Sequence, residues 1–119
     1  MASETSQETT RYADMLAAMG AEARLRVVRL LLTAHPKGMA AGDISAELGI
    51  NASTLSHHLD RLKREDVVTV RREGTFLWYQ ANTAALEQLI GFLFAECCTR
   101  TSAIAPERLI HVERGLRKP

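Results

Sequence analysis

The sequence has no apolar run long enough to cross a bilayer, and its 119 residues carry a formal net charge of only +1. Its first ten residues, MASETSQETT, are polar and acidic, whereas a secretory signal is basic and then apolar. We therefore expect a cytoplasmic protein. Because the charges nearly balance, any attraction to a polyanion has to come from a local cluster of basic residues.

Cysteine is nearly absent, since Cys97 and Cys98 are the only two thiols. A structural disulfide between them is not expected in the cytosol, and consecutive Cα atoms lie about 3.8 Å apart, closer than the usual span of a disulfide. The four histidines are scattered, which argues against a site for a hard or borderline metal ion. There is no internal repeat, and the length suits one domain.

Two short helices joined by a glycine turn form the clearest pattern in the sequence. Residues 43–48 predict a brief helix that Gly49 can close in the left-handed conformation, and Asn51 can cap the helix that follows. Helix, tight turn and second helix make up the helix-turn-helix signature. The same pattern also occurs in ordinary helical hairpins whose serines are merely solvated.

The second of these helices has one apolar side and one polar side. Leu55, Leu59 and Leu62 recur at i, i+4 and i+7, which predicts that they pack inward. The residues left on the outward side are short and polar: Ser53, Ser56, His57 and Asp60. Such a side is typical of a helix that reads DNA.

A β-hairpin is predicted directly after the second helix. Residues 67–72 and 76–80 are rich in β-branched and aromatic side chains, and a turn with Gly74 separates them. A helix-turn-helix followed by a hairpin is a winged helix. Arg71 and Arg72 lead into the wing, where they can reach a phosphate or the minor groove, although they also suit a solubilising edge strand.

The basic residues near this motif form the local cluster that DNA binding requires: Arg61, Lys63, Arg64, Arg71 and Arg72. Four acidic residues dilute the cluster: Asp60, Glu65, Asp66 and Glu73. We therefore expect moderate non-specific affinity, with tight binding dependent on two copies of the domain.

Further helices are predicted on both sides of the motif. One, capped by Thr9 or Thr10, carries Tyr12, Leu16 and Met19 on one side. A second begins at residue 22 with Leu25, Val28 and Leu32 inward, and residues 35–38 stop it. The last, capped by Asn82 or Thr83, has a wide apolar side made of Leu86, Leu89, Ile90, Leu93, Phe94 and Cys97.

The predicted fold is mainly α with a small β-hairpin, a winged helix-turn-helix that forms a homodimer through its terminal helices. We expect residues 1–10 to be a disordered N-terminus, residues 11–101 to form the DNA-binding and dimerisation domain, and residues 102–119 to be a C-terminal tail.

The order of these segments resembles the ArsR/SmtB family of small winged-helix repressors over nearly the whole chain. The strongest part runs from LSHHL at 55–59 to VV at 67–68, with the wing glycine Gly74 and the following Tyr79. The resemblance implies a homodimer that occupies an inverted-repeat operator and releases it when a metal, metalloid or redox signal binds. It places the base-reading positions on Ser53, Thr54, Ser56 and His57, and the wing contacts on Arg71 and Arg72.

Most of the sensor ligands that the resemblance implies are missing. The family's arsenite site is a Cys-x-Cys before the reading helix, where this chain has MAAGD at 39–43. Its zinc site needs Asp and His on the last helix, which has no His. The remaining candidates are Cys97 and Cys98, and arsenic-sensing members include ones with a Cys-Cys pair at this place, often followed by a third Cys. Residues 99–105 contain none.

Two interpretations of this thiol pair are open. Both cysteines can be small buried hydrophobes, since Cys97 continues the apolar side of the last helix. Alternatively they chelate trivalent arsenic or antimony, because a soft acceptor prefers thiolates. Arsenite favours three sulfur ligands, whereas methylarsenite has only two exchangeable positions. We therefore expect arsenite, methylarsenite or antimonite as inducer, with no constitutive cofactor.

The same fold could also serve as a thiol enzyme, a redox sensor or a protein-interaction module. A thiol enzyme is not expected, because the pair lies at the negative end of the helix dipole beside Glu96, with only Arg100 to offset it. A redox- or persulfide-sensing repressor of the same fold and a winged-helix protein-interaction module remain as alternatives.

Overall fold

The computed structural model describes the backbone of residues 2–100 and the side chains of residues 6–100. The chain forms two compact units, one ending at Leu86 and the other beginning at Glu87, and each is described by itself. None of the helices within the described range is long and apolar enough to span a membrane. The predicted tail, residues 102–119, lies outside the described residues.

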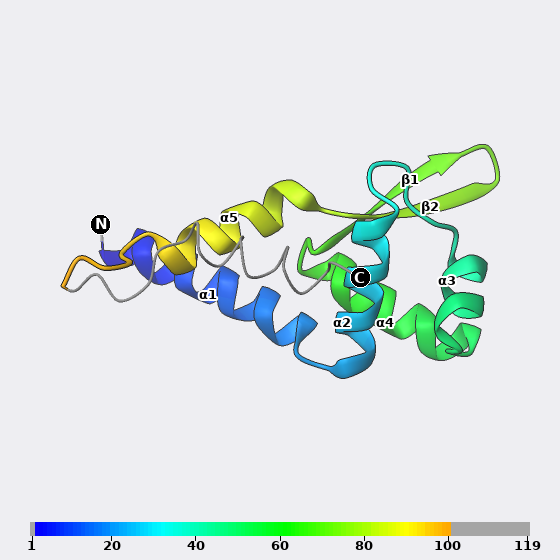
Figure 1. Ribbon diagram of the computed structural model, residues 1–119, viewed down its shortest axis with the longest axis horizontal. Helices are drawn as coiled ribbons and strands as arrows, with labels where there is room; N and C mark the ends of the chain where they lie inside the picture. Colours follow the sequence, from blue (N-terminus) through cyan, green and yellow to red (C-terminus); the bar gives the residue numbers. More distant parts are fainter. Residues whose placement is uncertain (1, 101–119) are drawn as a thin grey trace, which may run out of the picture. The chain divides into compact units, whose positions relative to one another are not determined.

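Helices and one antiparallel hairpin follow each other along the described chain (Figure 1). The elements are α1 (Ala2–Met19), α2 (Glu22–Thr33), α3 (Ala41–Leu48), α4 (Ala52–Arg64), β1 (Val68–Glu73), β2 (Phe76–Ala81) and α5 (Thr83–Phe94). This is the predicted order of a winged helix-turn-helix.

The helix-turn-helix consists of α3 and α4. Gly49 ends α3 with a left-handed φ of 66°, and its N–H donates to the Ser45 carbonyl at 2.9 Å. Asn51 caps α4, because its side chain accepts a hydrogen bond from Thr54 N at 2.9 Å. Both predicted helix ends are confirmed.

The predicted wing is the hairpin of β1 and β2. Val68 pairs with Ala81 at its base, and Glu73 pairs with Phe76 at its tip. The two-residue turn places Gly74 at a φ of 62°, which glycine adopts without steric penalty. Because side chains alternate along a strand, residues 69, 71 and 73 share one face of the wing, and residues 68, 70 and 72 share the other.

The core of the first unit packs around the inward side of α4. Leu55, Leu59 and Leu62 are buried, as predicted. The preceding helices and the start of the wing add further fully buried side chains: Met15, Val27, Leu31, Ile44, Val67 and Val68. Burying each such side chain contributes about 1.5–3 kcal/mol. The apolar side of α4 therefore holds the helix in place and leaves its polar side to the solvent.

Helix α1 begins earlier than predicted. It starts at Ala2, so residues 2–10, predicted to be disordered, are helical, and the predicted cap at Thr9 or Thr10 is wrong. No glycine or proline interrupts this polar stretch, so nothing in its backbone requires the helix to begin later.

The buried side of α1 and α2 also differs from the prediction. Leu16, Leu25 and Leu32 belong to the apolar sides that the spacing predicts, but they are exposed. The buried residues are Tyr12, Met15 and Ala18 on α1, and Val27, Val28 and Leu31 on α2. Both helices carry apolar residues on more than one side, so their spacing does not determine which side packs.

Helix α5 begins as predicted and ends early. The side-chain oxygen of Asn82 accepts a hydrogen bond from Ala85 N at 3.2 Å, which confirms one of the two predicted caps. The helix ends at Phe94, so Cys97 and Cys98 lie beyond it rather than in its last turn.

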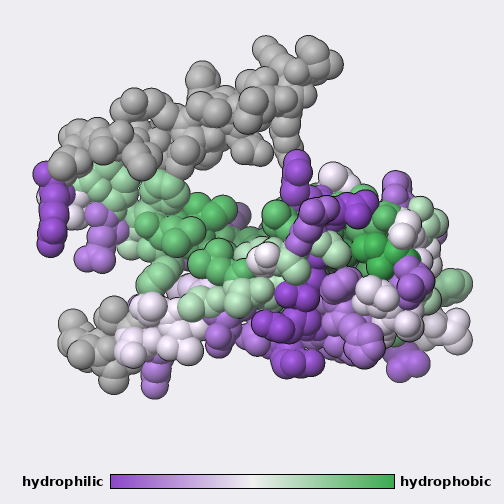
Figure 2. Space-filling view, turned by 90° about the horizontal axis from the view of Figure 1, so that it is seen from below, coloured by the Kyte–Doolittle hydropathy of each residue, from purple (hydrophilic) through white to green (hydrophobic). Residues whose placement is uncertain are grey.

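In the second unit the apolar side of α5 is only partly buried. Leu89 is buried, but Ile90 and Leu93 are 58% and 55% exposed. Figure 2 shows apolar surface where α5 runs. Exposed apolar residues clustered on one helix are typical of a surface that binds another molecule.

Candidate DNA-binding surface and thiol pair

The outward side of α4 exposes the predicted base-reading residues, which are Ser53, Thr54, Ser56 and His57. Leu55 and Leu59, which alternate with them in sequence, are buried. The packing of the leucines therefore fixes the direction in which the polar side chains point.

The Asn51 cap distinguishes among these reading residues. Asn51 Oδ1 accepts from Thr54 N, and the Ser53 hydroxyl lies 3.4 Å from the same oxygen. The side chains of Thr54, Ser56 and His57 make no hydrogen bond to the residues that the structure describes. Their donors and acceptors are therefore the ones free to contact base edges.

Basic side chains follow the reading residues along α4. Arg61 lies one turn beyond His57 on the same side and is half-buried, whereas Lys63 and Arg64 in the last turn are exposed. Cations in the last turn complement the negative end of the helix dipole, and they can also contact DNA phosphates.

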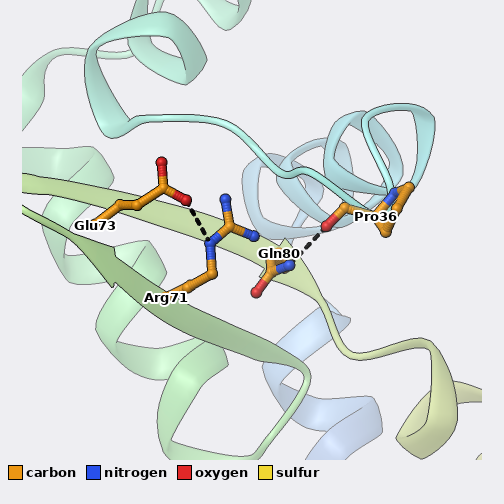
Figure 3. A network of polar contacts seen from close by, with 4 residues as sticks. All are labelled: Pro36, Arg71, Glu73 and Gln80. Carbon is orange, nitrogen blue, oxygen red and sulfur yellow. Dashed lines mark hydrogen bonds and ion pairs between the residues drawn. The ribbon is translucent and has the colours of Figure 1, made fainter.

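The two wing arginines point to opposite faces of the hairpin. Arg72 is exposed, and its Nε donates to the Gly74 carbonyl at 3.4 Å. The Arg71 side chain is 39% exposed, and its Nε lies 3.4 Å from Glu73 Oε2 in an ion pair (Figure 3). The Arg71 guanidinium also lies 5.9 Å from the centre of the Trp78 ring. Glu73 therefore offsets the charge of Arg71, whereas Arg72 makes no ion pair with the residues that the structure describes.

The loop between α2 and α3 is attached to the wing. Gln80 of β2 donates its side-chain N–H to the Pro36 carbonyl at 2.6 Å (Figure 3). The Lys37 ammonium lies 5.0 Å from the centre of the Trp78 ring, so Trp78 has both Lys37 and Arg71 as cationic neighbours. The sequence predicts residues 35–38 only as a helix stop, and it does not predict this contact.

Gly38 permits the close approach of the loop to β2. Met39 N donates to the Tyr79 carbonyl at 2.9 Å, and Tyr79 N donates to the Met39 carbonyl at 2.8 Å. Gly38 has a φ of 86°, and a Cβ at this position would collide with the Tyr79 carbonyl oxygen. The glycine at 38 is the sequence signal that could have indicated this packing.

Cys97 and Cys98 form a close pair in the second unit. Neither is in a disulfide, and their Sγ atoms lie 2.7 Å apart. Neighbouring side chains on a continuing helix point about 100° apart. Here the chain has left α5 and Cys98 adopts a φ of 66°, and the two sulfurs converge. Cys97 is half-buried and Cys98 is exposed, so the pair is not part of a closed apolar core.

The residues beside the cysteine pair offer few groups that could bind a metal ion. A shallow depression beside Cys98 is lined by Glu96, Thr99 and Arg100, which offer oxygen donors and a cation. Within residues 2–100, no group of three or more His, Cys, Asp or Glu side chains could hold a metal ion. Thiolate sulfur is the soft donor among these groups, so a binding role for Cys97 and Cys98 stays a prediction.

Comparison with known proteins identifies the class of regulator. Residues 19–71 match the family described as Helix-turn-helix domain. The chain is 33% identical to an HTH-type transcriptional regulator of Methanocaldococcus jannaschii, over 67% of this chain and 88% of that protein. It is 38% identical to the transcriptional repressor SdpR of Bacillus subtilis, over 46% of this chain and 61% of SdpR. It is 34% identical to the arsenical resistance operon repressor of Staphylococcus aureus, over 56% of this chain and 62% of that repressor.

Solved structures share the fold. A homodimeric winged helix-turn-helix DNA-binding domain from Mycobacterium bovis, described as a possible ArsR-family regulator, is 25% identical with a TM-score of 0.61, over 84% of this chain and 93% of that one. This chain belongs to the HTH-type transcriptional regulators. Reduced HlyU from Vibrio cholerae is 27% identical with a TM-score of 0.62, over 81% of this chain and 98% of HlyU. The predicted fold class is confirmed.

Membership in this family makes the chain a transcriptional regulator with a helix-turn-helix domain, and its similarity to the M. bovis domain agrees with the resemblance to the ArsR family. Its relatives are regulators rather than enzymes, and they include the repressor SdpR and the activator HlyU. Membership therefore does not by itself determine the sign of regulation. The roles of the individual DNA-contacting residues and of the thiol pair stay predictions.

Proposed function

We propose that this chain is a homodimeric repressor that binds an inverted-repeat operator and dissociates when trivalent arsenic binds Cys97 and Cys98. The observation that carries the proposal is the 2.7 Å approach of the two Sγ atoms. Two adjacent thiols whose sulfurs converge offer a bidentate soft-ligand site. The similarity to the arsenical resistance operon repressor of S. aureus supports this choice of inducer.

In the DNA-bound state, each protomer places the outward side of α4 in the major groove. Ser56 and His57 bond to base edges, and the exposed Arg72 on the wing contacts the backbone. The two reading helices of a dimer then meet half-sites about one helical turn apart. The near-neutral charge of the chain makes two copies necessary for tight binding.

Exposed apolar residues on α5 support the dimer. Ile90 and Leu93 leave an apolar surface on the second unit, and the related domain from M. bovis is homodimeric. Pairing this surface with that of a second copy removes it from water.

Binding of the inducer exchanges oxygen for sulfur on arsenic. Each thiol loses its proton and displaces one hydroxide, so that two As–S bonds form, two waters leave and the oxidation state of arsenic is unchanged. Methylarsenite has two exchangeable hydroxides and is fully satisfied by Cys97 and Cys98. Arsenite has three and keeps one hydroxide unless another thiol replaces it. Methylarsenite is therefore expected to release DNA at lower concentration than arsenite.

Release follows from linkage between the two sites. The inducer must bind the free dimer more tightly than the operator-bound dimer. Such a coupling free energy is usually about 1–3 kcal/mol, which changes operator affinity about 5- to 150-fold. A change of conformation at the end of α5 has to reach the reading helix with that energy.

Titrations of operator release test the proposal. We expect the native protein to leave a labelled operator at lower concentrations of methylarsenite than of arsenite, in a buffer without added thiol. Cys97→Ser and Cys98→Ser are expected to bind the operator like the native protein but to stay bound, because one sulfur cannot chelate. Release of the double serine variant by either arsenical would place the sensor elsewhere.

The exposure of Cys98 favours a second candidate, a redox- or persulfide-sensing repressor. Peroxide can oxidise two such thiols, one from each protomer, to a disulfide with release of two waters. Mass spectrometry after treatment with peroxide or polysulfide separates this candidate from metalloid sensing. Modification of Cys98 together with operator release, in a protein that does not respond to arsenicals, would favour the second candidate.

A further inference from the structure

Asn82, between β2 and α5, makes hydrogen bonds in two directions. Its Nδ2 donates to the Asp66 carbonyl at 2.9 Å, and its backbone N–H donates to the Val67 carbonyl at 3.0 Å. Its Oδ1 accepts from Ala85 N at 3.2 Å. One side chain therefore holds the turn that follows α4 and also caps the first turn of α5.

The turn that Asn82 holds is bonded to the reading helix. Asp66 N donates to the Lys63 carbonyl at 3.1 Å, and Val67 N donates to the Leu62 carbonyl at 3.0 Å. Asp66 has a φ of 61°, a region that is costly for a residue other than glycine, so its neighbours have to hold it there. These bonds satisfy carbonyls at the C-terminal end of α4, so a shift of the turn displaces or frays that end.

Helix α5 connects Asn82 with the cysteine pair. It runs without interruption from Thr83 to Phe94, and Cys97 and Cys98 follow its end closely. A helix moves largely as a rigid element, so a change imposed at its C-terminal end also acts on its first turn. That first turn is the one capped by Asn82.

We propose that Asn82 is the positioning residue through which ligand binding at the Cys pair changes the placement of the reading helix. This inference rests on the proposed function, because it takes the thiols as the inducer site. Without inducer, Asn82 bonds to Asp66 and Ala85, while the buried leucines of α4 hold the reading helix in place by themselves. With inducer, α5 is displaced, and the bond from Nδ2 to Asp66 carries the displacement to the end of α4.

Substitutions at Asn82 can remove its bond to the Asp66 carbonyl and keep its cap of α5. Asn82→Asp keeps an oxygen that caps α5, but it has no donor and faces the Asp66 carbonyl with a carboxylate. Asn82→Ser also caps a helix, but its side chain has no amide to reach Asp66. Gln80→Ala is the matched control, because it removes a side-chain bond to a backbone carbonyl, that of Pro36, which does not join α4 to α5.

The experiment measures the operator Kd with and without methylarsenite at one salt concentration, for the native protein and the three variants. The native protein and Gln80→Ala are expected to share a ratio of the two Kd values in the usual allosteric range of about 5- to 150-fold. For Asn82→Asp and Asn82→Ser the ratio is expected to approach one, with an inducer-free Kd close to the native value. Intact mass confirms that each variant still binds the arsenical.

The possible results are distinguishable. If both Asn82 variants keep the native ratio of operator Kd values with and without methylarsenite, the inference is wrong. If they bind the operator more weakly without inducer but keep that ratio, the inference is also wrong, since Asn82 would then only support the reading helix. If the native protein itself binds no arsenical, or binds it and keeps its operator, the proposed function fails first and the inference fails with it.

Discussion

At the scale of single residues, the side chains on α4 and those on the wing are suited to different contacts. Ser56 and His57 are exposed and make no side-chain hydrogen bond within the described range, so they can read base edges. Arg72 is exposed on the wing, whereas Arg71 is paired with Glu73. Since base contacts specify sequence and phosphate contacts position the protein, substitutions at the two places should differ in their sequence dependence.

Replacing Ser56 and His57 by Ala is expected to reduce discrimination between operator and random DNA by about 1–3 kcal/mol for each lost base contact. Competition binding with the two DNAs measures this difference. Ser53→Ala is the control on the same side of α4, with a smaller expected loss because the Ser53 hydroxyl lies within 3.4 Å of Asn51 Oδ1. Equal losses for operator and random DNA in the Ser56 and His57 variants would contradict base reading by this side.

Arg72→Ala is expected to weaken binding to all sequences alike and to lower the slope of log K against log salt by about 0.9. Arg71→Ala is expected to have a smaller effect, because Arg71 gives up its ion pair with Glu73 to reach a phosphate. Glu73→Gln frees Arg71 and is expected to steepen the slope. Operator Kd values at several salt concentrations measure the slopes of the three variants. Equal changes of slope in Arg71→Ala and Arg72→Ala would show that the two arginines contribute equally to DNA binding.

At the scale of elements, the wing depends on a loop distant from it in sequence. Met39 and Tyr79 exchange backbone hydrogen bonds, and Gln80 bonds to the Pro36 carbonyl. A hairpin of two strands is only marginally stable by itself. The loop therefore adds hydrogen bonds to the base of the wing.

Gly38→Ala is expected to lower the free energy of unfolding by about 1–3 kcal/mol, because residue 38 has a left-handed φ and a Cβ would meet the Tyr79 carbonyl. Gly42→Ala is the matched control, since nothing lies within 4 Å of a Cβ there and the position is inside α3. That variant is expected to be as stable as the native protein or more stable, by up to about 1 kcal/mol. Chemical denaturation measures both, and a neutral Gly38→Ala would show that the loop can move away.

At the scale of the whole molecule, DNA binding and dimerisation are assigned to different surfaces. The first unit carries the reading side of α4 and the wing, and the second unit carries exposed apolar residues on α5. Because the net charge is only +1, affinity for an operator depends on presenting two reading helices together.

Leu93→Asp is expected to give a monomer that keeps its helical content and binds the operator at least tenfold more weakly, about 1.4 kcal/mol or more. Leu93 is exposed, so the charge is tolerated in the separate chain but not in an apolar interface. Sedimentation measures the mass, and circular dichroism measures the helical content. Phe76→Asp, at an exposed apolar residue of the wing, is the control and is expected to stay dimeric. A dimeric Leu93→Asp would show that α5 is not the interface.

The sequence by itself determined the features that depend on neighbouring residues. Gly49 and Asn51 define the ends of the helices in the helix-turn-helix, and Gly74 defines the wing turn, because φ preferences and caps act within a few residues. The leucines of α4 were equally readable, since only one side of that helix is apolar. These local rules were sufficient to predict the winged helix and the exposed reading side.

Only the tertiary structure decided which of several possible surfaces pack and which distant residues meet. Leu16 is exposed although its spacing suits the core, because α1 has more than one apolar side. The Lys37 ammonium lies 5.0 Å from the centre of the Trp78 ring, and the bond from Gln80 to Pro36 spans 44 residues. Asn82 contacts the turn after α4 across a separation of 16 residues. Such contacts depend on the packing of whole elements, which local spacing and propensity do not specify.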